Sequence, residues 1–259
     1  KFTYEVGFNM TYFNSLWKVK ADEALSDLMN PYKRQTHQTD YYGLGYIDTG
    51  LYQNKEDILN SPRRLGSTQT KLGDIGYTDV NGDGKIDGED QVRIGKPTMP
   101  HFTYAFDFSL GYEGFTLSGL LYGTGERYMT FGNRYQSGEG KYLYYENQLN
   151  YWRPDNTGAD FPRISISSGV NGNNNKAGST FWMRNASYLR LKDLQLSYDF
   201  KYKYLKKCDW LQTCRVNLSG SNLFTISGVS KFFDPETSST SGNGYPVQRV
   251  YSIGVTIGF

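Results

Sequence analysis

Residues 101–123 read HFTYAFDFSLGYEGFTLSGLLYG, and this stretch decides the fold. In its first half every second residue is large and apolar, and small or polar residues separate them, which is the period of a β-strand with one apolar face. The apolar set comprises Phe102, Tyr104, Phe106, Phe108, Leu110 and Tyr112. Glu113 and Gly114 predict a two-residue turn, and residues 115–121 continue the apolar face after it, because the paired residues 112 and 115 must point the same way. The stretch therefore predicts a β-hairpin with one apolar side.

The same alternation recurs in four further runs of the chain. They read FTYEVGFNMTY (residues 2–12), LQLSYDF (194–200), RVNLSG (215–220) and VYSIGVTIGF (250–259). The first run is long enough to cross a bilayer as a tilted strand of about 9–11 residues, whereas strands of soluble proteins usually have about 5–6. We therefore expect membrane-crossing strands near residues 1–13, 101–112, 115–124, 181–200, 213–225 and 247–259.

Arg190 and Lys192 share the parity of the apolar residues in their run. We expect them on the apolar face of the sheet, above the hydrocarbon band, since charges within the band are costly.

Long and short connections alternate between the expected strands. The turns at Glu113-Gly114 and at residues 201–212 are short, and the connections at 14–100, 125–180 and 226–246 are long. Outer-membrane barrels have short periplasmic turns and long extracellular loops. The predicted fold class is therefore all-β: a transmembrane antiparallel β-barrel with extracellular loops at 14–100, 125–180 and 226–246. Six strands are fewer than the minimum of about eight, and Lys1 starts in mid-strand, so we expect the chain to be the C-terminal part of a larger barrel protein.

The long connections carry few regular patterns of their own. A short helix is expected at 21–29, and Tyr142, Tyr145, Leu149 and Trp152 have helical spacing. Residues 167–179 are rich in Gly, Asn and Ser, and we expect them to be mobile.

Composition supports a membrane barrel and gives little support to other classes. The 259 residues include 23 Tyr and have a net charge of +2, with a mean hydropathy of −0.63. Tyr suits the aromatic girdles at the two membrane interfaces, whereas the near-neutral charge gives no case for nucleic acid. No apolar run is long enough for a transmembrane helix.

Cys208 and Cys214 flank a short turn. The sequence is compatible with a disulfide between them and equally with two free thiols.

The acidic run DVNGDGKIDGED (79–90) has the spacing of a calcium loop. The ligands at positions 1, 3, 5, 7, 9 and 12 would be Asp79, Asn81, Asp83, the backbone carbonyl of Lys85, Asp87 and Asp90, with Gly84 at the sharp turn. The flanks lack helical spacing, so the loop joins strands, and Asp90 is shorter than the usual bidentate Glu. We expect a structural calcium ion in an extracellular loop. The alternative is a turn whose Asp and Asn side chains cap their own backbone without an ion.

Several loop aromatics could stack on a cargo molecule, or could instead pack the loops together. They are Tyr135, Tyr142, Tyr144, Tyr145, Trp152 and Trp182. No cargo residue is named from the sequence.

Catalysis has little support, because the two histidines, His37 and His101, are isolated and no nucleophile motif or phosphate-binding loop is present. We expect no catalytic residues and no enzyme.

Seven phrases of the chain, in this order, resemble the SusC/RagA-like TonB-dependent transporters of the Bacteroidetes outer membrane. They are GDIGYTDVNGDGKID, PTMPHFTYAFDFSLGYEGF, YWRPDNTGADFPR, SYLRLKDLQLSY, SNLF, DPE and YPVQRVYSIGVTIGF. The resemblance implies a 22-stranded barrel in outer-membrane lipid, with a plug and a TonB-contacting segment that this chain lacks. It also implies a SusD-like lipoprotein partner and uptake of oligosaccharides or peptides. The alternatives are a passive porin-like channel and a secreted calcium-stabilised glycan-binding or adhesin domain.

Overall fold

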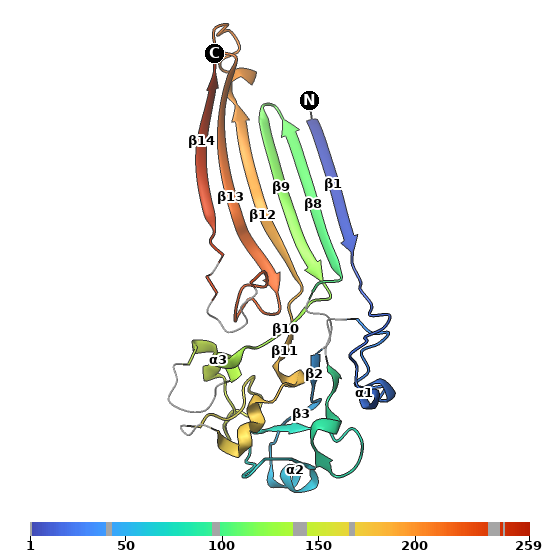
Figure 1. The fold of residues 1–259 in the computed structure, drawn as a ribbon. Coiled ribbons are helices and arrows are strands. Elements are labelled where there is room, and N and C mark those ends of the chain that lie inside the picture. The colour runs from blue at the N-terminus through green and yellow to red at the C-terminus, as the bar shows by residue number, and fades with distance from the viewer. Residues whose placement is uncertain are drawn as a thin grey trace.

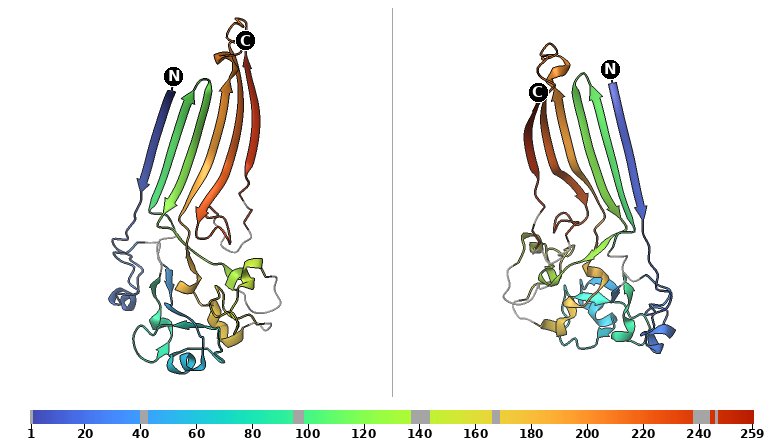
Figure 2. Two further views of the ribbon diagram at one scale, coloured as in Figure 1. Left: turned by 180° about the vertical axis from the view of Figure 1, so that it is seen from behind. Right: turned by 45° about the horizontal axis from the view of Figure 1, so that its top comes forward.

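Six long strands form one antiparallel sheet, and a loop-rich lobe lies at one end of it (Figure 1). The computed structural model describes residues 2–39, 43–94, 99–136, 144–165, 169–237, 244–245 and 247–259. The sheet has the order β1 (Phe2–Tyr12), β8 (Phe102–Tyr112), β9 (Phe115–Gly125), β12 (Tyr188–Asp199), β13 (Thr213–Ser227) and β14 (Val250–Gly258). Two further views show it as a single curved layer (Figure 2). The predicted all-β antiparallel class is confirmed, and the sheet is open, with β1 and β14 at its edges.

The short turns gather at the end of the sheet opposite the lobe (Figure 1). Glu113 and Gly114 join β8 to β9 with φ angles of 47° and 86°, so both residues are left-handed, as a two-residue hairpin turn requires. β12 and β13 are joined there by a turn that contains η5 (Phe200–Tyr202).

The strand register aligns apolar side chains into rows across one face of the sheet. One row joins Phe8, Phe106, Leu121, Leu191 and Phe224. The opposite face carries polar rows, such as the one that joins Glu5, Ser109, Ser118, Gln195, Ser219 and Ser252. Tyr251 and Ile253 on β14 are 72% and 74% exposed. A large exposed apolar face with a polar reverse side fits a wall between lipid and an aqueous interior.

Arg190 and Lys192 do not lie on the apolar face, and the expectation from their parity is wrong. In the pairing of β12 with β9, Leu191 lies opposite Leu121 and Asp193 opposite Leu120, so that Lys192 is the extra residue of a β-bulge. The register with β13 shifts at the same place, where two residues of β13 lie opposite Lys192. A bulge reverses the side to which the following residues point. Arg190 therefore lies in the polar row of Tyr122 and Thr225.

The long connections are more regular than expected. Four two-stranded sheets lie in the lobe: β2 (Gly43–Gly45) with β7 (Val92–Ile94), β3 (Asp48–Leu51) with β5 (Ile75–Tyr77), β4 (Arg63–Arg64) with β6 (Lys85–Ile86), and β10 (Tyr128–Thr130) with β11 (Met183–Asn185). The run expected as one strand at 181–200 is thus divided between β11 and β12.

Helical elements in the lobe are short. They are α1 (Leu25–Met29), α2 (Lys55–Asn60), α3 (Asn133–Gln136), η1 (Gly88–Asp90), η2 (Glu146–Leu149), η3 (Val170–Lys176) and η4 (Thr180–Trp182). The helix expected at 21–29 is only α1, and the helical spacing from Tyr142 to Trp152 yields only the single turn η2. Among the described residues, no helix has the length and apolar character to span a membrane.

Placing a charge on the apolar face tests this assignment of the two faces. Phe108→Arg is expected to lower the unfolding free energy in lipid by about 2–4 kcal/mol, because the middle of β8 would place the charge in hydrocarbon. Ser109→Arg is the matched control, since Ser109 lies beside Glu5 on the polar face. Reversible unfolding of the receptor in bilayers measures both variants, and equal losses would contradict the assignment.

Candidate functional site

The acidic loop at 79–90 folds around its own backbone. Asp79 accepts hydrogen bonds from the N–H groups of Gly82 and Gly84, both at 2.7 Å. Asn81 and Asp83 each accept from the N–H group two residues ahead, at 3.0 and 2.9 Å. Partial desolvation opposes the ionisation of Asp79, but the N–H groups of Gly84 and Gly82 outweigh it and lower the pKa of this carboxyl. Bonds of this kind are what we expect for the alternative without an ion, in which the Asp and Asn side chains cap their own backbone.

Asp90 closes the loop from its far end. Its side chain is fully buried and accepts from the N–H groups of Val80 at 2.9 Å and Asp87 at 2.8 Å. Asp87 in turn accepts from the N–H group of Glu89 at 2.8 Å. The position-12 carboxylate therefore joins the end of the run to Val80, its second residue.

The donor set is all oxygen, the kind of ligand that calcium takes. An ionised carboxylate has about four acceptor sites, so the bonds to backbone N–H groups leave lone pairs on Asp79, Asp83 and Asp87. In the described part of the chain, no group of three or more His, Cys, Asp or Glu side chains is arranged to hold a metal ion. Calcium binding by this loop stays a prediction.

The middle of the acidic loop positions a pair of arginines. β6 lies within the loop and pairs in parallel with β4, so that Arg63 lies beside Lys85 and Arg64 beside Ile86. The N–H group of Leu65 extends this contact by donating to the Ile86 carbonyl at 2.7 Å.

A buried carboxylate holds two distant parts of the lobe together. Asp74 is fully buried, and its oxygens accept from Arg163 at 2.6 Å, from Asn175 at 3.0 Å and from Asn171 at 3.1 Å. Asn171, Asn174 and Asn175 are themselves buried, so the described part of the stretch expected to be mobile is instead an ordered wall of the lobe. Sequence reasoning missed this network because its partners lie about a hundred residues apart in the chain.

Most of the loop aromatics pack the lobe rather than face a cavity. Tyr135, Trp152 and Trp182 are buried, and Tyr145 packs against Tyr135 with ring centroids 4.9 Å apart. Tyr144 is exposed at 36%, and Tyr142 lies outside the described residues. Burial favours the packing interpretation for these side chains.

Arg190 anchors a loop to the polar face of the sheet. Its guanidinium is 1% exposed and donates to Asp234 at 2.6 Å, to Glu236 at 3.0 Å and to Thr225 at 2.8 Å. Lys192 reaches Glu236 at 3.1 Å. Burial opposes the ionisation of Glu236, but Lys192 and the other donors outweigh it and lower the pKa of this carboxyl. The segment that follows β13 is therefore held against the sheet by charge pairs.

The remaining reactive groups form no catalytic arrangement among the described residues. His101 contacts Glu126 at 3.0 Å, and no nucleophile lies in a triad with it. Cys208 and Cys214 are both free thiols.

Comparison with known proteins adds sequence and fold relatives. The chain is 28% identical over 228 residues to TonB-dependent receptor P3 of Formosa agariphila, a match that covers 83% of this chain and 22% of that protein. It is 26% identical over 228 residues to TonB-dependent receptor P26 of the same organism, covering 81% of this chain and 22% of that one. No protein-family model matches it.

Solved structures of the RagAB peptide transporter share its fold. One matches with a TM-score of 0.70 and 21% identity, covering 99% of this chain and 27% of that chain. The RagAB peptide importer in the open-open state matches with a TM-score of 0.64 and 21% identity, covering 100% and 27%. The chain thus spans about a quarter of the length of these relatives, and the likeness shows that it has the fold of the matching part of the RagAB structures.

Proposed function

We propose that this chain belongs to the TonB-dependent receptors of the outer membrane and forms the C-terminal strands of an importer's barrel. The importer takes up oligosaccharides or peptides together with a SusD-like surface lipoprotein, and TonB supplies energy through a part of the protein outside this chain. One observation carries the proposal: six long strands align their apolar side chains on one face and their polar side chains on the other. The long loops then lie outside the cell and the short turns in the periplasm.

Uptake in cells tests the proposal against a passive channel. The full-length receptor, expressed with its neighbouring lipoprotein, is offered fluorescent oligosaccharide and peptide mixtures in cells with and without TonB. We expect uptake of one mixture, and we expect it to disappear without TonB. Uptake that persists without TonB would favour the porin-like alternative, and recovery of the native protein in the extracellular medium would favour the adhesin.

We further propose that the acidic loop binds one structural calcium ion. The side chains of Asp79, Asn81, Asp83, Asp87 and Asp90 would hold it together with the Lys85 carbonyl. In this role the two positive charges of the ion would offset part of the negative charge of the four ligating Asp side chains, and so stabilise the loop and the strand β4 that pairs with it.

Removing one ligand tests the calcium proposal. A ligand that binds only the folded state stabilises it by about 2.7 kcal/mol at a hundred times its Kd, so calcium is expected to raise the melting temperature of the receptor. Asp83→Ala is expected to abolish this rise. Glu89→Ala is the matched control, because Glu89 lies in the same loop but at a position that supplies no ligand. An unchanged calcium response in Asp83→Ala would refute the proposal.

A further inference from the structure

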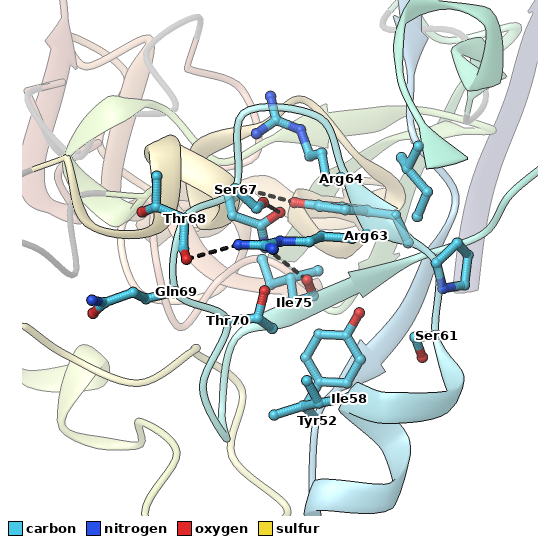
Figure 3. A pocket seen from close by; sticks show the side chains of 14 residues that line it. Tyr52, Ile58, Ser61, Arg63, Arg64, Ser67, Thr68, Gln69, Thr70 and Ile75 are labelled. Carbon is cyan, nitrogen blue, oxygen red and sulfur yellow. Dashed lines mark hydrogen bonds between the residues drawn. The ribbon is translucent and has the colours of Figure 1, made fainter. Parts of the chain in front are cut away.

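The lobe contains a cavity of about 300 Å³ beside strand β4. Its walls come from residues 52–70, from β5 and β6, and from Asn174. The Arg63 side chain extends along this cavity toward Thr68, and Figure 3 shows Thr70 and Ile75 next to its guanidinium. Ligand pockets span roughly 300–1,000 Å³, so this one suits a molecule of about the size of a single sugar or one or two amino acids.

The lining of the cavity carries two cations and no anion. Arg63 and Arg64 are its only charged side chains, and no Asp or Glu lines it. Within the described residues neither arginine forms an ion pair. Arg63 donates one hydrogen bond, to the Thr68 carbonyl at 2.7 Å. Arg64 donates to the Gly172 carbonyl at 3.4 Å, and its Nε is buried without a partner.

Two carboxylates close to the lining residue Tyr52, those of Asp74 and Asp57, are already occupied by other groups. Asp74 is paired with Arg163 and accepts from Asn171 and Asn175. Asp57 accepts from the backbone N–H groups of Gln53 and Asn54, at 3.0 and 3.2 Å, as the cap of α2. Neither is available to neutralise Arg63, so the cavity keeps a positive charge.

We propose that this cavity binds a small ligand that bears a carboxylate. The guanidinium of Arg63 is a planar fork that matches a carboxylate with two parallel hydrogen bonds. Hydroxyl groups of Tyr52, Thr68 and Thr70 on the same lining suit a polar remainder, while Ile75 and Ile86 form an apolar floor. Arg64 adds a second positive charge and stacks its guanidinium over the Tyr46 ring, 5.6 Å from the centroid.

The geometry of Arg63 depends on the acidic loop. β4 has two residues, and its only strand partner among the described residues is β6. Disturbing the loop at 79–90 is therefore expected to weaken binding in the cavity without any contact to the ligand. Binding here requires neither TonB nor a lipoprotein, so its test is separate from that of import.

Calorimetric titration of the purified full-length receptor in detergent tests the proposal. The probes are two pairs: N-acetyl-diglycine against its C-terminal amide, and D-galacturonate against D-galactose. We expect at least one carboxylate probe to bind about tenfold or more tighter than its neutral partner, since hydrogen bonds to charged groups contribute about 1.5–3 kcal/mol and about 1.4 kcal/mol is tenfold. Preference within the peptide pair identifies a peptide terminus as the source of the carboxylate, and preference within the sugar pair identifies a uronate.

Variants assign the binding to the cavity. Arg63→Gln is expected to remove the preference for the carboxylate, with the melting temperature unchanged, and Arg63→Lys is expected to weaken it because the charge remains without the fork. Arg153→Gln is the matched control, because Arg153 is a lobe arginine outside the lining that pairs with Asp155. The proposal is overturned if no carboxylate probe binds tighter than its neutral partner, or if Arg63→Gln binds like the unaltered receptor. If Arg63→Gln fails to fold, Arg63→Lys is measured in its place, and the proposal is overturned if Arg63→Lys binds the carboxylate probe like the unaltered receptor.

Discussion

Arg190→Ala is expected to lower the free energy of unfolding by about 3–5 kcal/mol, because it leaves two carboxylates without the buried guanidinium that pairs with them. Arg190 is 1% exposed, and Asp234 and Glu236 are 17% and 23% exposed at their side chains, so water replaces the lost partner only in part. The segment that contains Asp234 and Glu236 should detach from the sheet. Denaturant unfolding of the receptor measures the loss, and limited proteolysis between β13 and β14 measures the detachment.

Lys192→Ala provides the control for this prediction. Lys192 contacts the same Glu236, but its side chain is 39% exposed, and such pairs contribute about 0–1 kcal/mol. We expect a small loss of stability and little change in proteolysis. Comparable losses in the two variants would mean that burial of Arg190 is not the source of the effect.

Regular strands were predictable from the sequence, because the period of two appears in the residues themselves. The expected strands at 101–112 and 115–124 agree closely with β8 and β9, and the turn at Glu113-Gly114 is in place. The bulge at Lys192 was not predictable in the same way. Counting every second residue through Lys192 assigns Arg190 to the wrong face of the sheet, and only the pairing with β9 reveals the extra residue in β12. Asn222, with a φ of 55°, marks a matching irregularity on β13.

The lobe was less predictable because its contacts join distant segments. The partners of Asp74 come from residues 163–175, and the strand partner of Arg63 comes from the acidic loop. Strands of two or three residues are too short to show the alternation of apolar and polar residues by which a strand is predicted from the sequence. The acidic loop could be located from ligand spacing, whereas the cavity beside it depends on β4, which no pattern in the sequence indicates.

Trp182→Ala is expected to unfold the lobe while leaving the sheet intact. Trp182 is fully buried, lies among the rings of Phe131, Phe161 and Phe181, and donates its indole N–H to the Asn175 carbonyl at 2.9 Å. Truncation of a buried Trp costs about 3–5 kcal/mol, and here it also leaves a buried carbonyl without its donor. Hydrogen exchange should become faster at lobe amides, such as the N–H group of Ile75, and should stay slow in β8 and β9.

Trp210→Ala is the matched control, since Trp210 is 66% exposed at the opposite end of the sheet and stacks only on Phe259 among the described rings. Loss of one such aromatic pair costs about 0.5–1.5 kcal/mol and should leave exchange in the lobe unchanged. Faster exchange throughout the sheet in Trp182→Ala would show that the sheet and the lobe unfold as one unit. Faster exchange confined to the lobe would instead mean that the lobe has a core of its own, so that its cavity could change shape while the membrane wall stays fixed.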